Sequence, residues 1–280
     1  MDKLLIVDGS NLLFQMFFGM PARIVNAQGK AIQGTLGFVG ALLKIIRMTN
    51  PTHVLAVFDG EVANPRRELD EDYKSNRTDY SQWAEEDTPF SQLPDIYAAL
   101  DTLGICHRET ENCEADDWIA GYAKACGETM DVVIASQDGD FFQLITDRVS
   151  ILRYRGKHSQ LCDTAYIHEK LGIAPQQYAA FKSLTGDASD NIRGVPKVGP
   201  KTAAELMNQF GNLQNLLDRA EEIRKPSIRA SVACAAERIR KNYELILLSG
   251  CSALPFELQT LLWQDGGMTT TQVLEKIGLK

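Results

Sequence analysis

Three short apolar runs, each followed closely by an aspartate, limit what this 280-residue chain can fold into. The runs are residues 4–7 (LLIV), 54–58 (VLAVF) and 132–135 (VVIA). Short runs rich in branched side chains are typical of parallel strands that are buried on both faces. Helical apolar patterns lie between or beside them, at 34–49, 91–103 and 115–126. This alternation predicts a parallel sheet covered by helices.

The distribution of these patterns predicts two structural units and a tail. Residues 1–172 are predicted to form an α/β domain with a doubly wound, mostly parallel central sheet, and residues 151–163 a hairpin at its edge. Helical patterns dominate afterwards, at 175–185, 200–210, 212–217 and 226–247, so residues 173–250 are predicted to form a helical unit. Residues 251–280 contain a threonine-rich turn and no other pattern that we interpret.

Charge and cysteine content bear on location and partners. The net charge is −8 and the pI is about 5.1, which taken alone argues against a nucleic-acid partner unless bound cations offset a cluster of acids. Six scattered cysteines without a C-x-x-C pair fit a reducing cytosol. The sequence has no apolar run of about 18 residues and no signal-peptide pattern. We therefore expect a cytoplasmic protein with no membrane partner.

Four aspartates follow the predicted strands: Asp8, Asp59, Asp138 and Asp140. Because ligands of open parallel sheets bind beyond the carboxyl ends of the strands, these side chains should share one crevice. No lysine stands beside them in the sequence, so their repulsion would destabilise the fold without cations. Mg²⁺ prefers such oxygen ligands. The pattern therefore predicts a divalent-metal site.

The stretch NCEADDWIA (112–120) places three acids at the start of a predicted helix. Helix capping would explain them, because acids in a first turn stabilise a helix by about 0.3–1 kcal/mol each. Metal binding is the other interpretation. On an ideal helix Glu114 and Asp117 share a face and Asp116 points away. At least one of the three therefore needs a different local geometry or has an indirect role.

Residues 60–90 are dense in charge and poor in aliphatic side chains. A solvated surface loop would have this composition. Up to residue 89 the segment also carries three aromatic and four cationic side chains, a mixture that can stack bases and hold phosphates. They are Tyr73, Tyr80, Trp83, Arg66, Arg67, Lys74 and Arg77. Both interpretations remain open at this point.

The helical unit contains GDASDNIRGVPKVGPKTA (186–203), in which Asp187 and Asp190 could serve a second metal. The following pattern, Gly-x-x-x-x-Gly-x-Lys-Thr, resembles a P-loop but has one additional residue before the lysine. No predicted strand precedes it, so nucleotide binding is a poor interpretation. A turn that leads into helix 200–210 at Gly199 fits better, since a helix start can bind a backbone phosphate. A plain glycine-containing turn is the alternative.

Six motifs in a fixed order make the chain resemble the bacterial and phage 5′-nuclease family, which comprises the 5′–3′ exonuclease domain of DNA polymerase I and stand-alone flap endonucleases. The motifs lie at residues 4–14, 57–60, 66–77, 114–117, 136–144 and 186–203. The resemblance covers residues 3 to about 248. It implies a PIN-like nuclease core, with an arch at 60–90, and a helix-hairpin-helix DNA-binding unit.

The resemblance also implies the roles of individual residues. The implied ligands of two Mg²⁺ ions, with Mn²⁺ as a substitute, are Asp8, Asp59, Glu114, Asp116, Asp117, Asp138, Asp140, Asp187 and Asp190. Lys74 and Arg77 would contact the scissile phosphate. The implied DNA-binding residues are Tyr73, Lys182, Arg193, Gly194, Val195, Lys197, Gly199, Lys201 and Thr202. Backbone carbonyls of residues 194–202 would in addition hold K⁺.

The activity that the resemblance implies is that of a metal-dependent, structure-specific 5′ nuclease in primer removal or repair. Its substrates would be DNA with 5′ flaps or 5′ single-stranded ends, or RNA–DNA primers, and the protein would be a monomer. A non-catalytic DNA-binding relative and an RNA-processing nuclease with a similar crevice are the alternatives. A phosphatase with Asp8 as nucleophile fits less well, because Ser10 stands where such an enzyme needs a second acid.

Two positions depart from the family pattern. Gln15 occupies a place where the family often has arginine, and the arch segment 78–90 is longer and more acidic than usual. Both changes concern the path of the single strand and leave the metal-site acids in place. No polymerase segment follows in this sequence, so we expect a stand-alone nuclease or an excised domain.

Overall fold

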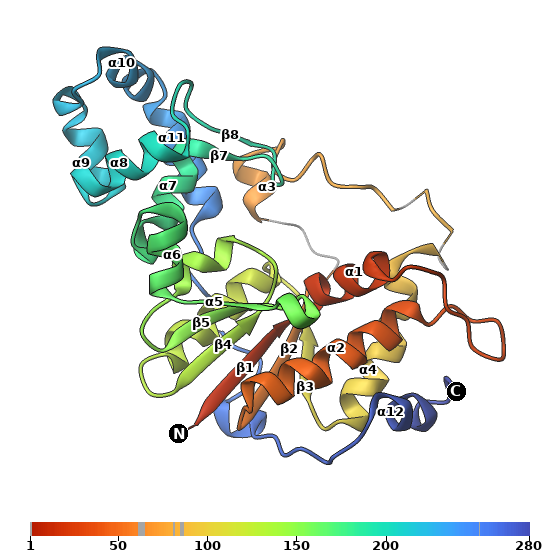
Figure 1. The fold of residues 1–280 in the computed structure, drawn as a ribbon. Coiled ribbons are helices and arrows are strands. Elements are labelled where there is room, and N and C mark those ends of the chain that lie inside the picture. The colour runs from red at the N-terminus through yellow and green to blue at the C-terminus, as the bar shows by residue number, and fades with distance from the viewer. Residues whose placement is uncertain (1, 61–64, 81, 85–86, 252) are drawn as a thin grey trace.

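The computed structural model describes residues 2–60, 65–80, 82–84, 87–251 and 253–280. Its centre is a six-stranded sheet in the order β3-β2-β1-β4-β5-β6, in which only β6 is antiparallel (Figure 1). The strands are β1 (Lys3–Asp8), β2 (His53–Phe58), β3 (Cys106–Glu109), β4 (Asp131–Ala135), β5 (Val149–Arg153) and β6 (Gln160–Cys162). The predicted fold class, a doubly wound and mostly parallel sheet, is confirmed.

Helices cover both faces of the sheet, as the continuous apolar strands require. Successive residues of β1 belong to two different hydrophobic clusters, one on each face of the sheet. Leu4 and Ile6 belong to the first cluster, and Leu5 and Val7 belong to the second. Three helices pack on the second face and α5 (Ala115–Cys126) packs on the first. Those three are α1 (Gly9–Gly19), α2 (Gln33–Thr49) and α4 (Leu93–Thr102).

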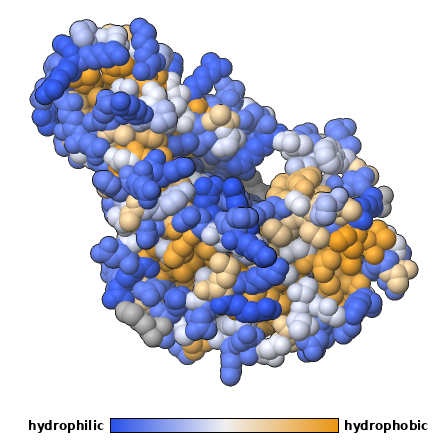
Figure 2. Space-filling model, in the orientation of Figure 1, coloured by the Kyte–Doolittle hydropathy of each residue, from blue (hydrophilic) through white to orange (hydrophobic). Residues whose placement is uncertain are grey.

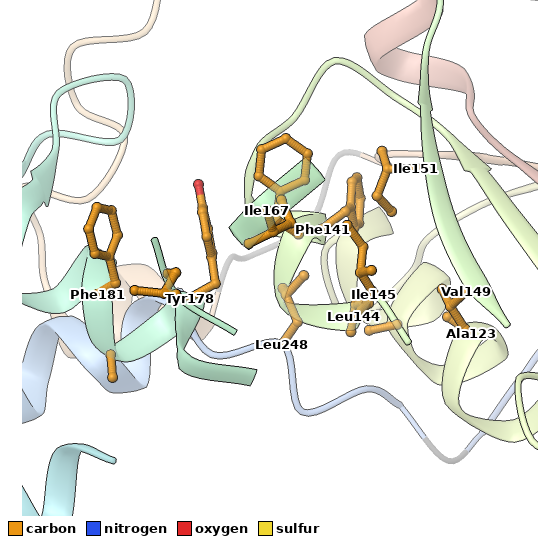
Figure 3. Packing of buried hydrophobic residues seen from close by; sticks show 14 of the residues in the cluster. Ala123, Phe141, Leu144, Ile145, Val149, Ile151, Ile167, Tyr178, Phe181 and Leu248 are labelled. Atoms are coloured by element: carbon orange, nitrogen blue, oxygen red, sulfur yellow. The ribbon is translucent and has the colours of Figure 1, made fainter. Parts of the chain in front are cut away.

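The helical unit forms a lobe beside the sheet (Figure 1). The α/β domain ends with α6 (Thr164–Leu171). The elements of the lobe are α7 (Tyr178–Thr185), a ribbon of β7 (Gly186–Asp187) and β8 (Ile192–Arg193), α8 (Pro200–Phe210), α9 (Leu213–Asp218), α10 (Pro226–Cys234) and α11 (Ala236–Ile246). The lobe shares one hydrophobic cluster with the sheet, to which Tyr178 and Phe181 of α7 belong together with Phe141 and Ile151 (Figure 3). The shared cluster ties the lobe directly to the sheet.

The C-terminal segment packs back on the α/β domain. Leu262 forms an antiparallel bridge with His53 at the edge of β2, and the Trp263 amide donates to the Thr52 carbonyl at 2.9 Å. The predicted threonine-rich turn is in fact the start of helix α12 (Thr270–Lys276). Thr269 and Gln272 form a capping box there, because each side chain bonds the other's backbone.

Other differences from the expected elements have local causes. Strand β3 was not predicted because it is a polar strand at the edge of the sheet, held by its register with β2. Helices α1 and α6 were also missed, and each is capped by an aspartate side chain, Asp8 and Asp163 respectively. The helix expected over 226–247 is broken in two at Ala235. The predicted edge hairpin is confirmed as β5 and β6.

The strand order reverses between β1 and β4, and crevices of doubly wound sheets form at such a point. The carboxyl ends of β1, β2 and β4 face the side from which the helical lobe extends (Figure 1). The fold therefore directs the strand-end aspartates toward the lobe. Within the described ranges, no helix has the length and apolarity that a membrane span needs.

Candidate functional site

Asp8 and Asp138 meet at the ends of β1 and β4. One oxygen of Asp8 caps helix α1 by accepting from the Asn11 amide at 3.0 Å. Its other oxygen accepts from the Ser136 hydroxyl at 2.7 Å, and the same hydroxyl accepts from the Asp138 amide at 3.0 Å. Ser136 therefore holds these two acids at fixed places in one crevice.

Asp59 joins the end of β2 to the start of helix α5. Its carboxylate accepts from the Ala115 amide at 2.9 Å, which is the first N–H of that helix. Its own amide donates to the Ser10 hydroxyl at 2.8 Å. Asp59 thus connects the end of β2 by a hydrogen bond to helix α5, which follows Glu114.

The three acids of α5 point in two directions. Glu114 and Asp117 share a face, as ideal helix geometry predicts, and both bind the guanidinium of Arg66. Asp116 lies half-buried on the other side, where desolvation and the charges of Asp138 and Asp8 raise its pKa well above the usual value. Asp116 is therefore the acid of this helix that belongs to the strand-end cluster.

Burial and mutual repulsion dominate the electrostatics of this cluster. Burial raises the pKa of Asp8 to about 7, and the charges of Asp59 and Asp138 add to the effect. Burial and the charge of Asp138 likewise raise the pKa of Asp140 well above its usual value. Burial raises the pKa of Asp138 as well, with contributions from acids of the helical lobe.

Asp187 and Asp190 come from the β7–β8 segment of the lobe and reach the same cluster. Both contribute to the repulsion that raises the pKa of Asp140. Asp187 pairs with Lys182 at 2.6 Å, and Asp190 pairs with Arg77 at 3.1 Å. Although burial opposes it, the hydrogen bond from Lys182 holds the pKa of Asp187 below its usual value.

The expectation that no cation neutralises these acids was wrong. Arg66, Lys74, Arg77 and Lys182 each form an ion pair with at least one of them, because the fold brings distant segments together. In the part of the chain that the structure describes, no three acidic, cysteine or histidine side chains already form a complete metal-ligand set. The cluster consists of buried acids beside acids held by cations.

Lys74 lies at the centre of the site. Its backbone has a left-handed φ of 56°, and its amide donates to the Asp190 carbonyl at 3.0 Å. Its ammonium donates to Glu114 at 2.5 Å and is buried. Although burial would lower it, the neighbouring Tyr73 and Glu114 raise the pKa of Lys74 above its usual value. The lysine therefore stays charged inside the acidic cluster.

Tyr73 corrects the expectation of an exposed, base-stacking ring. Its side chain is 4% exposed and packs with Ala179, Ile192 and Leu245. The ring also lies 4.8 Å from the Lys74 ammonium. In this arrangement Tyr73 supports Lys74 and does not offer a face to a base.

The rest of the arch region carries an aromatic cluster. Tyr80 lies at its centre, with ring centroids of Trp83 at 5.2 Å and of Phe14, from α1, at 5.8 Å. Phe18 and Phe90 also contact Tyr80 and are about half exposed. Tyr80 and Trp83 are therefore the rings of the arch for which base stacking stays a prediction. Residues 61–64, 81 and 85–86 of the arch lie outside the described residues.

A cavity of about 710 Å³ extends from the acidic cluster into the helical lobe. Its lining includes Asp187 and Pro200, the first residue of α8. Its cationic lining is Arg153, Lys170, Lys182 and Arg193. Figure 2 shows hydrophilic residues along the notch between the lobe and the α/β body. A cationic path therefore connects the acids to the start of α8.

The turn before α8 has the geometry expected for an anion site. Helix α8 begins after Gly199, which has no side chain to cap the first N–H groups, and Lys197 and Lys201 beside it are exposed. Thr202 lies in the first turn and Val195 is buried beneath the turn. A phosphate could bind the free helix start there.

Gly194 acts through close packing of the backbone. A Cβ at this position would lie 2.3 Å from the Thr185 carbonyl oxygen and 2.8 Å from the Gly186 nitrogen. Only glycine therefore lets the end of β8 return beside the end of α7.

Sequence reasoning missed the residues that hold the acids in place: Ser10, Ser136 and Arg66. Each lies inside a motif that the sequence shows, DGSN, SQDGD or RRELDEDYKSNR. Their partners are distant in sequence, so only the folded chain reveals the contacts. Gln15 bonds the Tyr154 carbonyl at 2.8 Å, and so ties α1 to the end of β5.

Fold and site together define a class: a resolvase-like α/β domain with an acidic crevice, joined to a helical unit. Residues 3–172 match the family model of the 5′–3′ exonuclease N-terminal resolvase-like domain. Residues 173–268 match that of the 5′–3′ exonuclease C-terminal SAM fold. The chain therefore belongs to the 5′–3′ exonuclease family.

Its relatives include bacterial DNA polymerases I. The thermostable enzyme of Thermus thermophilus is 34% identical over 87% of this chain, and that of Deinococcus radiodurans is 31% identical over 99%. The chain spans 28% of the length of each.

Among solved structures, the flap endonuclease of bacteriophage T5 in a complex with DNA and metal ions superposes with a TM-score of 0.72. The sequence identity is 25%, and the superposition covers 88% of this chain and 89% of that one. The catalytic core of Rad2 with DNA shares the fold, with a TM-score of 0.60, 18% identity and coverage of 99% of this chain and 93% of that one.

Proposed function

We propose that this protein is a metal-dependent 5′ nuclease that hydrolyses DNA phosphodiesters at 5′ flaps or 5′ single-stranded ends. One observation carries the proposal: acids from three strand ends and helix α5 share one electrostatic cluster with acids from the helical lobe. Family membership and the resemblance to a DNA-bound flap endonuclease support it.

The residues of the cluster fit divalent metal ions. Buried oxygen donors whose pKa values are raised by one another gain stability when a hard cation joins them. We infer that Asp8, Asp116, Asp138 and Asp140 form the inner ligands, and that Asp59, Glu114, Asp117, Asp187 and Asp190 complete the two sites directly or through water. When bound, Mg²⁺ or Mn²⁺ would lower the pKa of water and stabilise charge on the reacting phosphate.

The protein's own cations would bind the phosphate. Lys74 is buried beside Glu114, and Arg77 reaches Asp190 from a more exposed position. Metal ions at those carboxylates would compete with both ion pairs and leave the two cations available to the scissile phosphate. A well-placed donor at such a position contributes about 2.7–4 kcal/mol to transition-state stabilisation.

The DNA would follow the charges and rings of the surface. Arg193, Lys182 and the start of α8 would hold the duplex backbone, with Lys197 and Lys201 at the rim. Unpaired bases would stack on the cluster around Tyr80 and Trp83. A K⁺ ion bound by carbonyls of residues 194–202 and the cleavage of RNA–DNA primers remain predictions of the family resemblance.

One assay separates this proposal from its rivals. Labelled 5′-flap DNA, the matched single strands, an RNA hairpin and p-nitrophenyl phosphate are each incubated with Mg²⁺ or with EDTA. We expect cleavage of flap DNA in Mg²⁺ only. Binding of flap DNA without cleavage would indicate a non-catalytic relative, and preferred cleavage of the RNA hairpin would indicate an RNA-processing nuclease.

A further inference from the structure

Arg66 is the cation of the site that contacts the most separate parts of the fold. Its side chain is 10% exposed, and its two terminal nitrogens bind the two oxygens of Asp117 at 2.8 and 3.0 Å. One of those nitrogens also bonds Glu114. Its Nε donates at 3.0 Å to the carbonyl of Leu245, in the last turn of α11. Arg66 thus joins α3 (Pro65–Leu69), helix α5 and the helical lobe.

The chemistry of these contacts requires a guanidinium. A planar fork can bind both oxygens of a carboxylate, reach a second carboxylate and still donate through Nε. A lysine at this position would supply one charge without the fork. Although burial opposes it, the hydrogen bond to Asp117 and the charge of Glu114 raise the pKa of Arg66 above its usual value. The guanidinium therefore remains charged where it is buried.

The position of Arg66 fixes the rotation of α5. Glu114 and Asp117 lie three residues apart on one face, where their like charges would repel each other without a cation between them. With that face held against Arg66, Asp116 projects from another face of α5, where the charges of Asp138 and Asp8 act on it. The direction of Asp116 is thus coupled to a residue that lies outside the acidic cluster itself.

Arg66 also connects the base of the arch to the site. Glu114 is bound from one side by Arg66 of α3 and from the other by Lys74. Both cations belong to the segment 66–77, which packs against the lobe through Lys241 and Asp70 at 2.8 Å. Displacement of the arch base would therefore disturb Glu114 directly.

We propose that Arg66 is a positioning residue of the nuclease site, which holds Glu114 and Asp117 on the outer face of α5 and so directs Asp116 into the metal-binding cluster. The inference rests on the proposed function. Residues that orient metal ligands in this way change metal affinity or activity by about 10- to 100-fold when they are replaced.

The test compares Arg66→Lys and Arg66→Gln with Arg67→Gln, which removes a charge from the neighbouring exposed residue of the same helix. Mn²⁺ binding to the DNA-free protein is measured by titration calorimetry, and flap cleavage is followed as a function of Mg²⁺ concentration. Flap binding in EDTA and the melting temperature control for the DNA surface and the fold.

We expect Arg66→Gln to weaken Mn²⁺ binding about 10- to 100-fold and to raise the Mg²⁺ concentration needed for cleavage, with flap binding within about threefold of the native protein. Arg66→Lys should restore only part of the loss.

If Arg66→Gln does not fold, Arg66→Lys decides. Mn²⁺ binding and cleavage equal to those of Arg67→Gln would show that Arg66 only supports the fold, and would overturn the inference. A native protein that neither binds Mn²⁺ nor cleaves flap DNA would refute the proposed function instead.

Discussion

At the scale of single residues, the acids of the site differ in what offsets their charge. Glu114 and Asp117 bind Arg66, and Asp187 binds Lys182. Asp8 instead lies buried, and Asp116 half-buried, among other carboxylates. The second kind gains most from a divalent cation, since binding removes both burial cost and repulsion. A metal ion that binds the paired acids must displace the lysine or arginine side chain that holds them. Metal binding therefore releases those side chains from their ion pairs.

Lys74→Ala should lower the single-turnover rate of flap cleavage by about 100- to 1000-fold, because a buried donor to the reacting phosphate is lost. Flap binding should change little, since the proposed function places most phosphate contacts along the helical lobe. Quench-flow cleavage and an equilibrium binding titration measure the two effects. A rate within a few fold of the native rate would contradict the role of Lys74.

Asp8 makes the stability of the metal-free protein depend on pH. Its pKa is raised from 3.8 to about 7 in the folded state, so its burial costs stability above the lower value, and the cost is complete above the higher one. That shift of about three units corresponds to about 4 kcal/mol. In EDTA, Asp8→Asn should therefore raise the melting temperature more at pH 8 than at pH 5.5. An equal effect at both pH values would contradict the assignment.

At the scale of elements, the short β7–β8 ribbon is the part that brings the lobe into the site. It carries Asp187 and leads to Asp190, whose carbonyl accepts from the Lys74 amide. Asn76 and Asn191 bond across the same junction to backbone carbonyls, at 2.8 and 2.9 Å. The arch base and the ribbon thus form one packed unit.

Gly194→Ala tests this packing. The new Cβ would collide with backbone atoms of Thr185 and Gly186, so the ribbon must shift. We expect a loss of about 1–3 kcal/mol in the free energy of unfolding, together with slower cleavage because Asp187 and Asp190 move. Urea unfolding and flap cleavage measure the two effects. Gly266→Ala, where a Cβ would meet no atom within 4 Å, is the matched control and should change neither. Native stability in Gly194→Ala would show that the ribbon tolerates displacement.

Elements could be predicted where a local pattern determines them. Strands β1, β2 and β4 have continuous apolar interiors because both faces are covered, and these runs are visible without the fold. Strand β3 is polar and exists only because β2 offers a partner, and Thr269 signals a helix start only through its contact with Gln272. Tertiary pairing and capping of this kind leave weak traces in the sequence.

At the scale of the whole molecule, the site also combines features that a local sequence pattern determines with features that depend on tertiary contacts. The strand-end acids could be predicted because parallel strands deliver their ends to one edge. The cations that bind them could not, since Arg66 and Asp117 are 51 positions apart and Lys182 reaches the cluster from another unit. The acidic net charge of −8 reflects in part this cluster, so it does not argue against a nucleic-acid partner.

The central claim is that acids of both structural units hold the metal ions, and Asp187→Asn with Asp190→Asn tests it most directly. The double variant removes the lobe's two acids, while Glu257→Gln with Asp265→Asn removes two exposed charges elsewhere. Cleavage of labelled 5′-flap DNA in Mg²⁺ and flap binding in EDTA are measured for both. We predict that the first variant binds flap DNA but does not cleave it and that the control does both. Cleavage by Asp187→Asn/Asp190→Asn at nearly the native rate would contradict the account.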